Sequence, residues 1–386
     1  MKKLRQFIDR IKPNFVEGGK LPWLKSTFEG FETFAFTPNE TTQKGAHIRD
    51  AIDMKRAMIT VVLALIPALL FGMFNIGYQS GFWSEGASAI SNIWDCFVFG
   101  LVRMLPLIAV SYIVGLTIEF AFAQIRHHAI NEGFLVTGLI IPMIVPVTTP
   151  LWQLAIAVAF AVVIGKEVFG GSGMNFLNPA LIARAFLFFA YPTAMSGDKV
   201  WVAQDWWGTD AITRATPLGE MMIGAELPST SVTDLLIGTV AGSTCETSVI
   251  AILIGAVILL ASGIASWRVM LGVFIGGGLL GGLFNLIGAN AYMEMPFYYH
   301  YLIGGFMFGA VFMATDPVTS AQTRTGKWIY GLLIGAFAVL LRVLNPAYPE
   351  GMMLAILLMN CFAPLIDHCV IAQNIKKRNK RIAQPK

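Results

Sequence analysis

The sequence predicts an all-α protein that crosses a membrane about ten times, with both termini on the cytoplasmic side. Three observations support this fold class: the composition, the spacing of the apolar runs and the distribution of basic residues. Of the 386 residues, 56% are hydrophobic and 13% are charged, and the mean hydropathy is +0.66. A soluble chain carries about 25% charged residues, so most of this chain has too few polar side chains to face water.

Ten apolar runs approach the length of about 20 helical residues that is needed to cross the hydrocarbon core. They lie near residues 57–76, 97–122, 134–149, 151–168, 178–192, 248–266, 269–291, 297–315, 328–345 and 352–371. Two runs are poor spans, because the third contains Pro142, Pro146 and Pro150 and the fifth has only about 15 residues. Lipid does not tolerate unpaired backbone groups. Each therefore predicts either a kinked helix packed on its neighbours or a half-helix end that faces a cofactor or an ion.

The basic residues predict the orientation, because Lys and Arg are enriched in cytoplasmic segments. With both termini inside, the inner segments hold 22 of the 27 Lys and Arg, and the outer loops hold only Lys199 and Arg214. Five spans on each side of a long outer loop give two halves of opposite orientation, as in an inverted repeat. The predicted segments are a cytoplasmic or interfacial 1–56, a first half 57–192, a periplasmic loop 193–247, a second half 248–371 and a basic tail 372–386.

The composition argues against several other classes of protein. The net charge of +4 gives no basic face for nucleic acid. The four cysteines are scattered and form no C-x-x-C pair, so neither a zinc site nor a disulfide framework is indicated. No nucleophile–base pair and no metal-ligand cluster is recognisable, so we predict neither a catalytic side chain nor a resident metal site.

Two polar segments are candidate cofactor sites. Residues 210–217 read Asp-Ala-Ile-Thr-Arg-Ala-Thr-Pro, and by themselves they are typical of an exposed loop that carries the hydroxyl of Thr216. The segment 166–179 contains a glycine-rich run followed by Asn175 and Asn178. Its glycines allow close backbone approach, and the two amides could hydrogen-bond a flavin ring edge or ribityl hydroxyls. An equally supported alternative is a capped re-entrant helix with Asn178 as its N-cap.

Several carboxylates lie within or beside the apolar runs, where a charge costs at least about 2.5 kcal/mol. Glu119 and Asp367 lie near the inner ends of spans two and ten, Asp316 follows span eight, and Glu132 precedes span three. Carboxylates on the inner side could guide Na⁺, because hard cations prefer oxygen ligands. The alternative for each is a structural ion pair or an interfacial charge.

The N-terminal segment 21–36 interleaves aromatic and polar residues, among them Trp23, Glu29 and Phe31. Such a stretch is typical of the bilayer interface and of membrane lipid contact. Flat rings at headgroup depth could also admit a quinone head.

Several motifs taken together resemble the family of B subunits of the Na⁺-translocating NADH:quinone oxidoreductase along almost the whole chain. The matching stretches are residues 114–119, 131–134, 166–180, 185–192, 313–318 and 345–354. The D subunits of the Rnf complex, a ferredoxin:NAD⁺ oxidoreductase, form a sister family that shares the core and the threonine motif. The long basic N-terminal segment looks like the quinone-reductase version.

The resemblance implies FMN joined to Thr216 through a phosphoester by a flavin transferase, and riboflavin held noncovalently at Asn175 and Asn178. Arg214 stands where the family motif usually has glycine, and Leu116 replaces a usual second glycine. The remaining roles that the resemblance implies are quinone positions at Gly115, Leu116 and the segment of Trp23, Glu29 and Phe31, and a role in Na⁺ uptake or quinone reduction for Glu29, Glu119, Asp316 and Asp367.

The resemblance therefore predicts a flavin-carrying subunit of a six-subunit complex in the bacterial inner membrane. This complex would pass electrons from NADH to ubiquinone or menaquinone and export Na⁺. Two alternatives remain: the D subunit of an Rnf complex, and an ion or solute transporter with no redox role. A yellow flavin spectrum would separate the redox proteins from the transporter.

Overall fold

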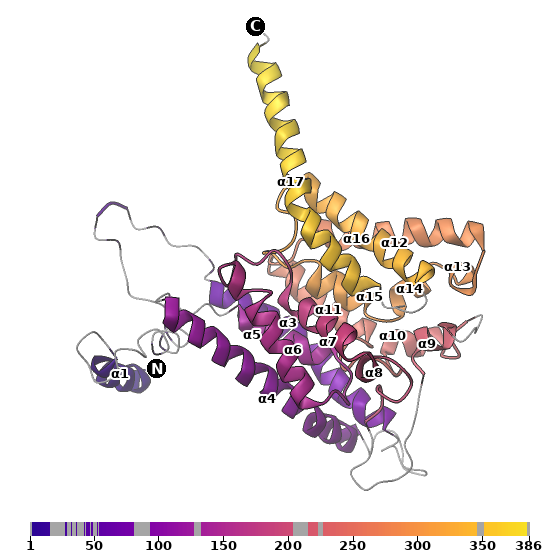
Figure 1. Ribbon diagram of the computed structural model, residues 1–386, viewed down its shortest axis with the longest axis horizontal. Helices are drawn as coiled ribbons and strands as arrows, with labels where there is room; N and C mark the ends of the chain where they lie inside the picture. The colour runs from indigo at the N-terminus through magenta and orange to yellow at the C-terminus, as the bar shows by residue number, and fades with distance from the viewer. Residues whose placement is uncertain are drawn as a thin grey trace.

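The computed structural model describes residues 2–15, 54–80, 93–126, 133–203, 215–222, 227–345 and 351–383, with a few separate positions between residues 28 and 52. All regular secondary structure in these residues is helical (Figure 1). The all-α class is therefore confirmed. Within the described residues, six helical segments are long and apolar enough to cross a membrane.

The six long segments account for most of the predicted spans. They are α3 (Met54–Gln79), α4 (Ile93–Arg126), α6 (Leu151–Val163, extended to Phe169 by the short helix η4), α12 (Trp267–Ile287), α16 (Arg324–Leu344) and α17 (Met352–Ala383). Three apolar helices are shorter: α5 (Phe134–Ile144), α7 (Pro179–Ala190) and α11 (Val249–Ala261). Figure 1 shows α17 extending past the other helices to the C-terminal end.

The third predicted span is helical over only part of its length. Its helix α5 ends at Ile144, and Val145 is extended, with φ −100° and ψ 159°. The cause is local, because Pro146 sterically disfavours the helical conformation at the residue before it. Pro150 then forms the N-cap of α6. Residues 134–149 thus form a half-helix followed by a turn, in which the Thr149 N–H donates to the Pro146 carbonyl oxygen at 3.2 Å.

The eighth predicted span, 297–315, is not one continuous helix, and that expectation is wrong. After the short helix α13 (Ala291–Glu294), this span forms α14 (Tyr299–Leu302), α15 (Phe306–Phe308) and a π-helix, η5 (Gly309–Met313). The break comes at Ile303, which is extended, and at Gly304, whose φ is +67°. Glycine adopts this left-handed conformation without the steric penalty of a side chain.

Short helices also occur outside the spans. Within the predicted outer loop, the structure has α8 (Pro192–Met195), α9 (Pro217–Met222) and α10 (Val232–Ile237). Near the N-terminus, α1 (Lys2–Ile11) continues into the short helix η1 (Lys12–Asn14). Arg5 and Lys12 both form ion pairs with Glu32.

Glycines allow α12 and α16 to pack closely. Each helix presents a Gly-xxx-Gly pair, Gly272 and Gly276 on α12 and Gly331 and Gly335 on α16. A Cβ atom at Gly276 would lie 2.0 Å from the carbonyl oxygen of Leu332. In lipid, helices associate through such close backbone contacts rather than through the hydrophobic effect, so an alanine at this position would force the two helices apart.

The two halves of the chain share a pattern of helix contacts. In the first half, α4 packs on α6, α6 packs on α7, and α5 contacts α3, α4 and α7. In the second half, α12 packs on α16, α16 packs on α17, and η5 contacts α11, α12 and α17. The halves meet where α3 contacts α11 and where α7 contacts α17. One contact breaks the pattern: α3 packs extensively on α4, and α11 and α12 have no comparably extensive contact in the described part of the chain.

Candidate functional site

Two pockets that contain polar side chains lie at opposite ends of α11. The first contains Thr216, and we call it the Thr216 pocket; it is lined in part by Thr247, two residues before α11 begins. The second contains Asn175 and Asn178, and we call it the asparagine cavity; it is lined in part by Leu259, near the end of α11. An α-helix rises 1.5 Å per residue, so these two positions along α11 are separated by about 18 Å.

The asparagine cavity has a volume of about 150 Å³. Its polar lining residues are Thr137, Lys166, Ser172, Asn175, Asn178, Thr315 and Asp316. Apolar side chains from α3, α5, α11 and η5 form the rest of the wall; they include Met58, Val61, Ile140, Leu259 and Phe312. The structure thus brings the two predicted asparagines next to the predicted carboxylate of Asp316.

Asn178 caps the start of α7. Its side-chain oxygen accepts a hydrogen bond from the Ala180 N–H at 3.0 Å, and Pro179 occupies the first helical position. Its Nδ2 atom donates to Asp316 Oδ2 at 3.4 Å. Asn175 Nδ2 donates to the carbonyl oxygen of Leu177 at 3.0 Å. The alternative of a capped helix is therefore confirmed, and the same side chains also line the cavity.

Asp316 and Asp367 hold the two ends of one loop, residues 316–323. Asp316 accepts hydrogen bonds from the Val318 N–H and from the Thr319 hydroxyl, both at 3.0 Å. Burial raises the pKa of the Asp316 carboxyl above its ordinary value, and these two hydrogen bonds oppose that rise. Asp367, on α17, accepts from the Gln322 N–H at 2.6 Å and the Thr323 N–H at 3.0 Å.

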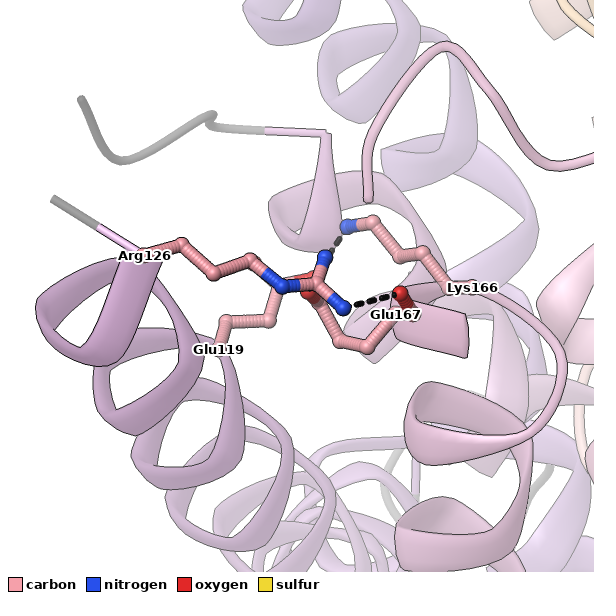
Figure 2. A network of polar contacts seen from close by, with 4 residues as sticks. All are labelled: Glu119, Arg126, Lys166 and Glu167. Atoms are coloured by element: carbon pink, nitrogen blue, oxygen red, sulfur yellow. Dashed lines mark hydrogen bonds and ion pairs between the residues drawn. The ribbon is translucent and has the colours of Figure 1, made fainter. Parts of the chain in front are cut away.

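Glu119 belongs to a network of four charged side chains (Figure 2). It comes from α4, is buried, and pairs with the ammonium group of Lys166, which follows α6. Arg126 Nη1 lies 3.4 Å from Glu167 Oε2, and its Nη2 donates to the Glu167 carbonyl oxygen at 2.8 Å. Sequence reasoning identified Glu119 and left open a structural ion pair, which the structure confirms. It did not identify Lys166 and Glu167 as members of the network.

Gly115 lies one helical turn before Glu119 on the same buried face of α4. A Cβ atom at Gly115 would lie 1.9 Å from Cζ of Phe134, so the missing side chain makes room for this ring. The Phe134 ring is buried, packs edge-on against Tyr112, and has Lys166 Nζ 5.9 Å from its centroid. Leu116, on the adjacent face, is partly buried against the hydrophobic core. The quinone role of Gly115 and Leu116 stays a prediction.

The Thr216 pocket is small, about 30 Å³. The Thr216 side chain is partly exposed, and its hydroxyl oxygen accepts a hydrogen bond from the Gly219 N–H at 3.0 Å at the start of α9. The Tyr292 hydroxyl donates to the Leu218 carbonyl oxygen at 3.0 Å and holds α9 in place. The other lining residues are mainly apolar and include Leu218, Leu235, Val240, Leu302 and Ile303.

A buried ion pair connects the Thr216 pocket to the half-helix α5. Arg184 Nη1 lies 3.1 Å from Glu246 Oε2, and each side chain is only 3% exposed. Arg184 also donates to the carbonyl oxygen of Ile144, the last residue of α5, and to the Ser243 hydroxyl at 3.3 Å. Ser243 and Glu246 line the Thr216 pocket. Arg184 therefore holds α5, α7 and the 243–246 loop together.

Sequence reasoning missed Glu246, although a signal was present. It is the only Asp, Glu, Lys or Arg between Asp234 and Arg268, in a stretch that is otherwise apolar or neutral. A charge in such a position normally has a partner in the protein interior. That partner, Arg184, lies 62 residues away in the chain, so the sequence does not indicate which charge pairs with Glu246.

Four predicted site residues lie outside the described residues: Trp23, Glu29, Phe31 and Glu132. The loop residue Arg214 also lies outside them. Within the part of the chain that the structure describes, no group of three or more His, Cys, Asp or Glu side chains is arranged to hold a metal ion.

Helices of membrane-spanning length, charge pairs buried in the protein interior and two pockets that contain polar side chains, all within the described residues, define a multi-pass membrane protein. Within that class, the chain belongs to the NQR2, RnfD, RnfE family, which it matches over residues 41–376.

Curated relatives are similar along nearly the whole chain. The chain is 49% identical over 404 residues to the B subunit of the Na(+)-translocating NADH-quinone reductase of Stutzerimonas stutzeri, covering 98% of this chain and 99% of the relative. It is 48% identical over 401 residues to the protein of the same name in Azotobacter vinelandii, and 45% identical over 402 residues to that in Pseudomonas aeruginosa, with the same coverage.

Proposed function

We propose that this chain is the flavin-carrying membrane subunit of a Na⁺-translocating NADH:quinone oxidoreductase in a bacterial inner membrane. The observation that carries this proposal is the similarity of 45–49% along nearly the full length to relatives that bear this name. The Rnf proteins share the family, but the relatives reported above are all named as quinone reductase subunits. The quinone reductase is therefore the function we propose.

Thr216 is the proposed attachment point of FMN. Thr216 is a partly exposed residue, so a flavin transferase could reach it. The adjacent pocket, at about 30 Å³, is too small to enclose a flavin. A flavin on Thr216 would therefore remain largely at the surface of this chain, where another subunit of the complex could approach it.

The asparagine cavity is the proposed riboflavin site. Its amides, the Ser172 hydroxyl and the Lys166 ammonium provide the hydrogen-bonding groups that flavin carbonyls and ribityl hydroxyls require. Its volume of about 150 Å³ lies below the range of about 300–1,000 Å³ that is common for ligand pockets. The donor set fits the ligand, and the walls must move apart for a whole flavin to enter.

Bound flavins supply the electron-transfer chemistry, and the protein supplies their positions and electrostatic surroundings. Asn178 caps α7 and also donates a hydrogen bond to Asp316, so it would fix the position of the start of α7 relative to the 316–323 loop. Glu119, Asp316, Asp367 and Glu132 are the proposed carboxylates of the cation pathway. Gly115 and Leu116, with the segment of Trp23, Glu29 and Phe31, are the proposed quinone positions, for ubiquinone or menaquinone.

The proposed topology has ten crossings, cytoplasmic termini and an inverted repeat of two five-helix halves. The matching contact patterns of the two halves support the repeat. With this topology, Thr216 lies on the periplasmic side, and the asparagine cavity with Glu119 lies on the cytoplasmic side. Electrons would then move inward through the subunit, in the direction opposite to exported Na⁺.

The test is intact-mass spectrometry of the chain, isolated in its complex from cells that contain the flavin transferase. The wild-type chain should carry the mass of one FMN, which Thr216→Ala should lack. Thr216→Ser, which keeps a hydroxyl, serves as the matched control and should retain some of the adduct. Equal masses for wild type and Thr216→Ala would refute the attachment, and a complex without flavin absorbance would instead indicate a non-redox transporter.

A further inference from the structure

The buried pair of Lys166 and Glu119 joins the cation pathway to the asparagine cavity. The Glu119 and Lys166 side chains are 5% and 4% exposed, respectively, so each charge depends on the other rather than on water. The backbone of Lys166 is held in place, because its carbonyl oxygen accepts hydrogen bonds from the N–H groups of Phe169 and Gly171. Any movement of this charge must therefore come from the side chain.

The second pair of the network explains why Lys166 is available to Glu119. Arg126 contacts both the carboxylate and the carbonyl oxygen of Glu167. The Arg126 side chain is 36% exposed. Figure 2 shows the guanidinium of Arg126 in front of the Glu119 carboxylate, with Glu167 at the end of the dashed line from Arg126. The four charges balance, two positive and two negative. A cation that reached Glu119 would therefore add one uncompensated positive charge to the network.

Besides pairing with Glu119, Lys166 could place its charge in the asparagine cavity. It lines the asparagine cavity together with Asn175, Asn178 and Asp316. A lysine carries a compact charge on a flexible four-carbon stem with three rotatable donors. The side chain can therefore turn from Glu119 towards the cavity while its backbone stays in place.

We propose that Lys166 is the resident counter-cation of Glu119 and that it couples negative charge in the asparagine cavity to Na⁺ binding at Glu119. This inference rests on the proposed function, in which the cavity holds a flavin reduced by electrons from NADH. Negative charge in the cavity attracts the ammonium group of Lys166, and the carboxylate of Glu119 is then free for Na⁺. One electron enters and one Na⁺ enters, Lys166 stays protonated, and no covalent bond forms or breaks.

The test is equilibrium binding of radioactive ²²Na⁺ to the purified complex, oxidised and then reduced with dithionite. The wild-type complex should bind Na⁺ more tightly when reduced. Lys166→Met removes the competing charge, so the oxidised complex should bind Na⁺ on the order of tenfold more tightly than wild type, and reduction should change little. Lys166→Arg should bind Na⁺ more weakly, because a guanidinium holds a carboxylate through two hydrogen bonds.

Two further variants identify the site that responds. In Glu119→Gln, a second substitution of Lys166 to Met should no longer change Na⁺ affinity, because the carboxylate that the lysine guards is absent. Lys199→Met makes the same substitution at an exposed loop lysine and should bind Na⁺ as wild type does. The double variant Glu119→Gln with Lys166→Met leaves no unpaired buried charge, so it should assemble even if Lys166→Met alone does not. In that case the Na⁺ affinity of Lys166→Arg tests the proposal.

An unchanged Na⁺ affinity in both Lys166→Met and Lys166→Arg, with flavin absorbance intact, would overturn the inference and leave the proposed function standing. If Lys166→Met does not assemble, an unchanged affinity in Lys166→Arg has the same meaning. A wild-type complex without flavin absorbance would refute the proposed function, and the redox coupling with it.

Discussion

Removing the charge of Arg184 should destabilise the protein strongly, because this side chain holds three segments together. In Arg184→Met, the carboxylate of Glu246 and the carbonyl oxygen of Ile144 at the end of α5 both lose a cationic donor. With both side chains only 3% exposed, water cannot replace the guanidinium. Breaking a buried pair in this way costs about 3–5 kcal/mol.

A double-mutant cycle separates the pair from its surroundings. Glu246→Gln should cost less, about 1–3 kcal/mol, because Arg184 still donates to Ile144 and Ser243. The double variant Arg184→Met with Glu246→Gln should be more stable than the sum of the single effects, with a coupling energy of about 1–3 kcal/mol.

The assay is unfolding of the detergent-solubilised chain by increasing fractions of SDS, followed by the fluorescence of its nine tryptophans. The control is Arg324→Met, which removes an exposed arginine at the start of α16 and should change stability by less than about 0.5 kcal/mol. The reasoning is refuted if Arg184→Met is no less stable than this control, or if the single effects simply add.

Two further predictions use the same assay. Gly115→Ala should destabilise the protein by about 1–3 kcal/mol, because the new Cβ would meet the Phe134 ring. Gly282→Ala, a helical glycine with open space around it, is the matched control and should not destabilise; equal effects would contradict the packing described for Phe134. Asn178→Ser should keep the cap of α7 and change stability by less than about 0.5 kcal/mol, whereas Asn178→Ala should cost about 1 kcal/mol. Both variants should release less riboflavin than wild type on acid extraction. If Asn178→Ser releases as much riboflavin as wild type, the Asn178 amide does not bind riboflavin.

Several elements of the fold could be predicted because their causes are local. Pro146 follows the end of the half-helix α5, Pro150 is the N-cap of α6, and Asn178-Pro179 starts α7 at the predicted residue. Each of these signals acts on the residue itself or on its immediate neighbour. For the same reason, the capped helix at Asn178 was open to inference from the sequence.

The break in span eight could not be predicted, because glycine has no single meaning in a membrane helix. Gly276 and Gly281 lie in α12, which stays regular, and Gly276 packs closely against α16. Gly304 interrupts the span instead, with φ +67°. Glycine is common in membrane helices in both roles, and only the neighbouring helices determine which role it takes.

The sequence by itself determined the helical class, most of the apolar spans and the family motifs, because hydrophobicity and proline stereochemistry act over short distances along the chain. Only the tertiary structure decided which charges meet. Lys166 pairs with Glu119 and Arg184 with Glu246 across 47 and 62 residues. Such pairs depend on how helices and loops pack together, because a buried charge is tolerated only where a distant part of the chain supplies its partner.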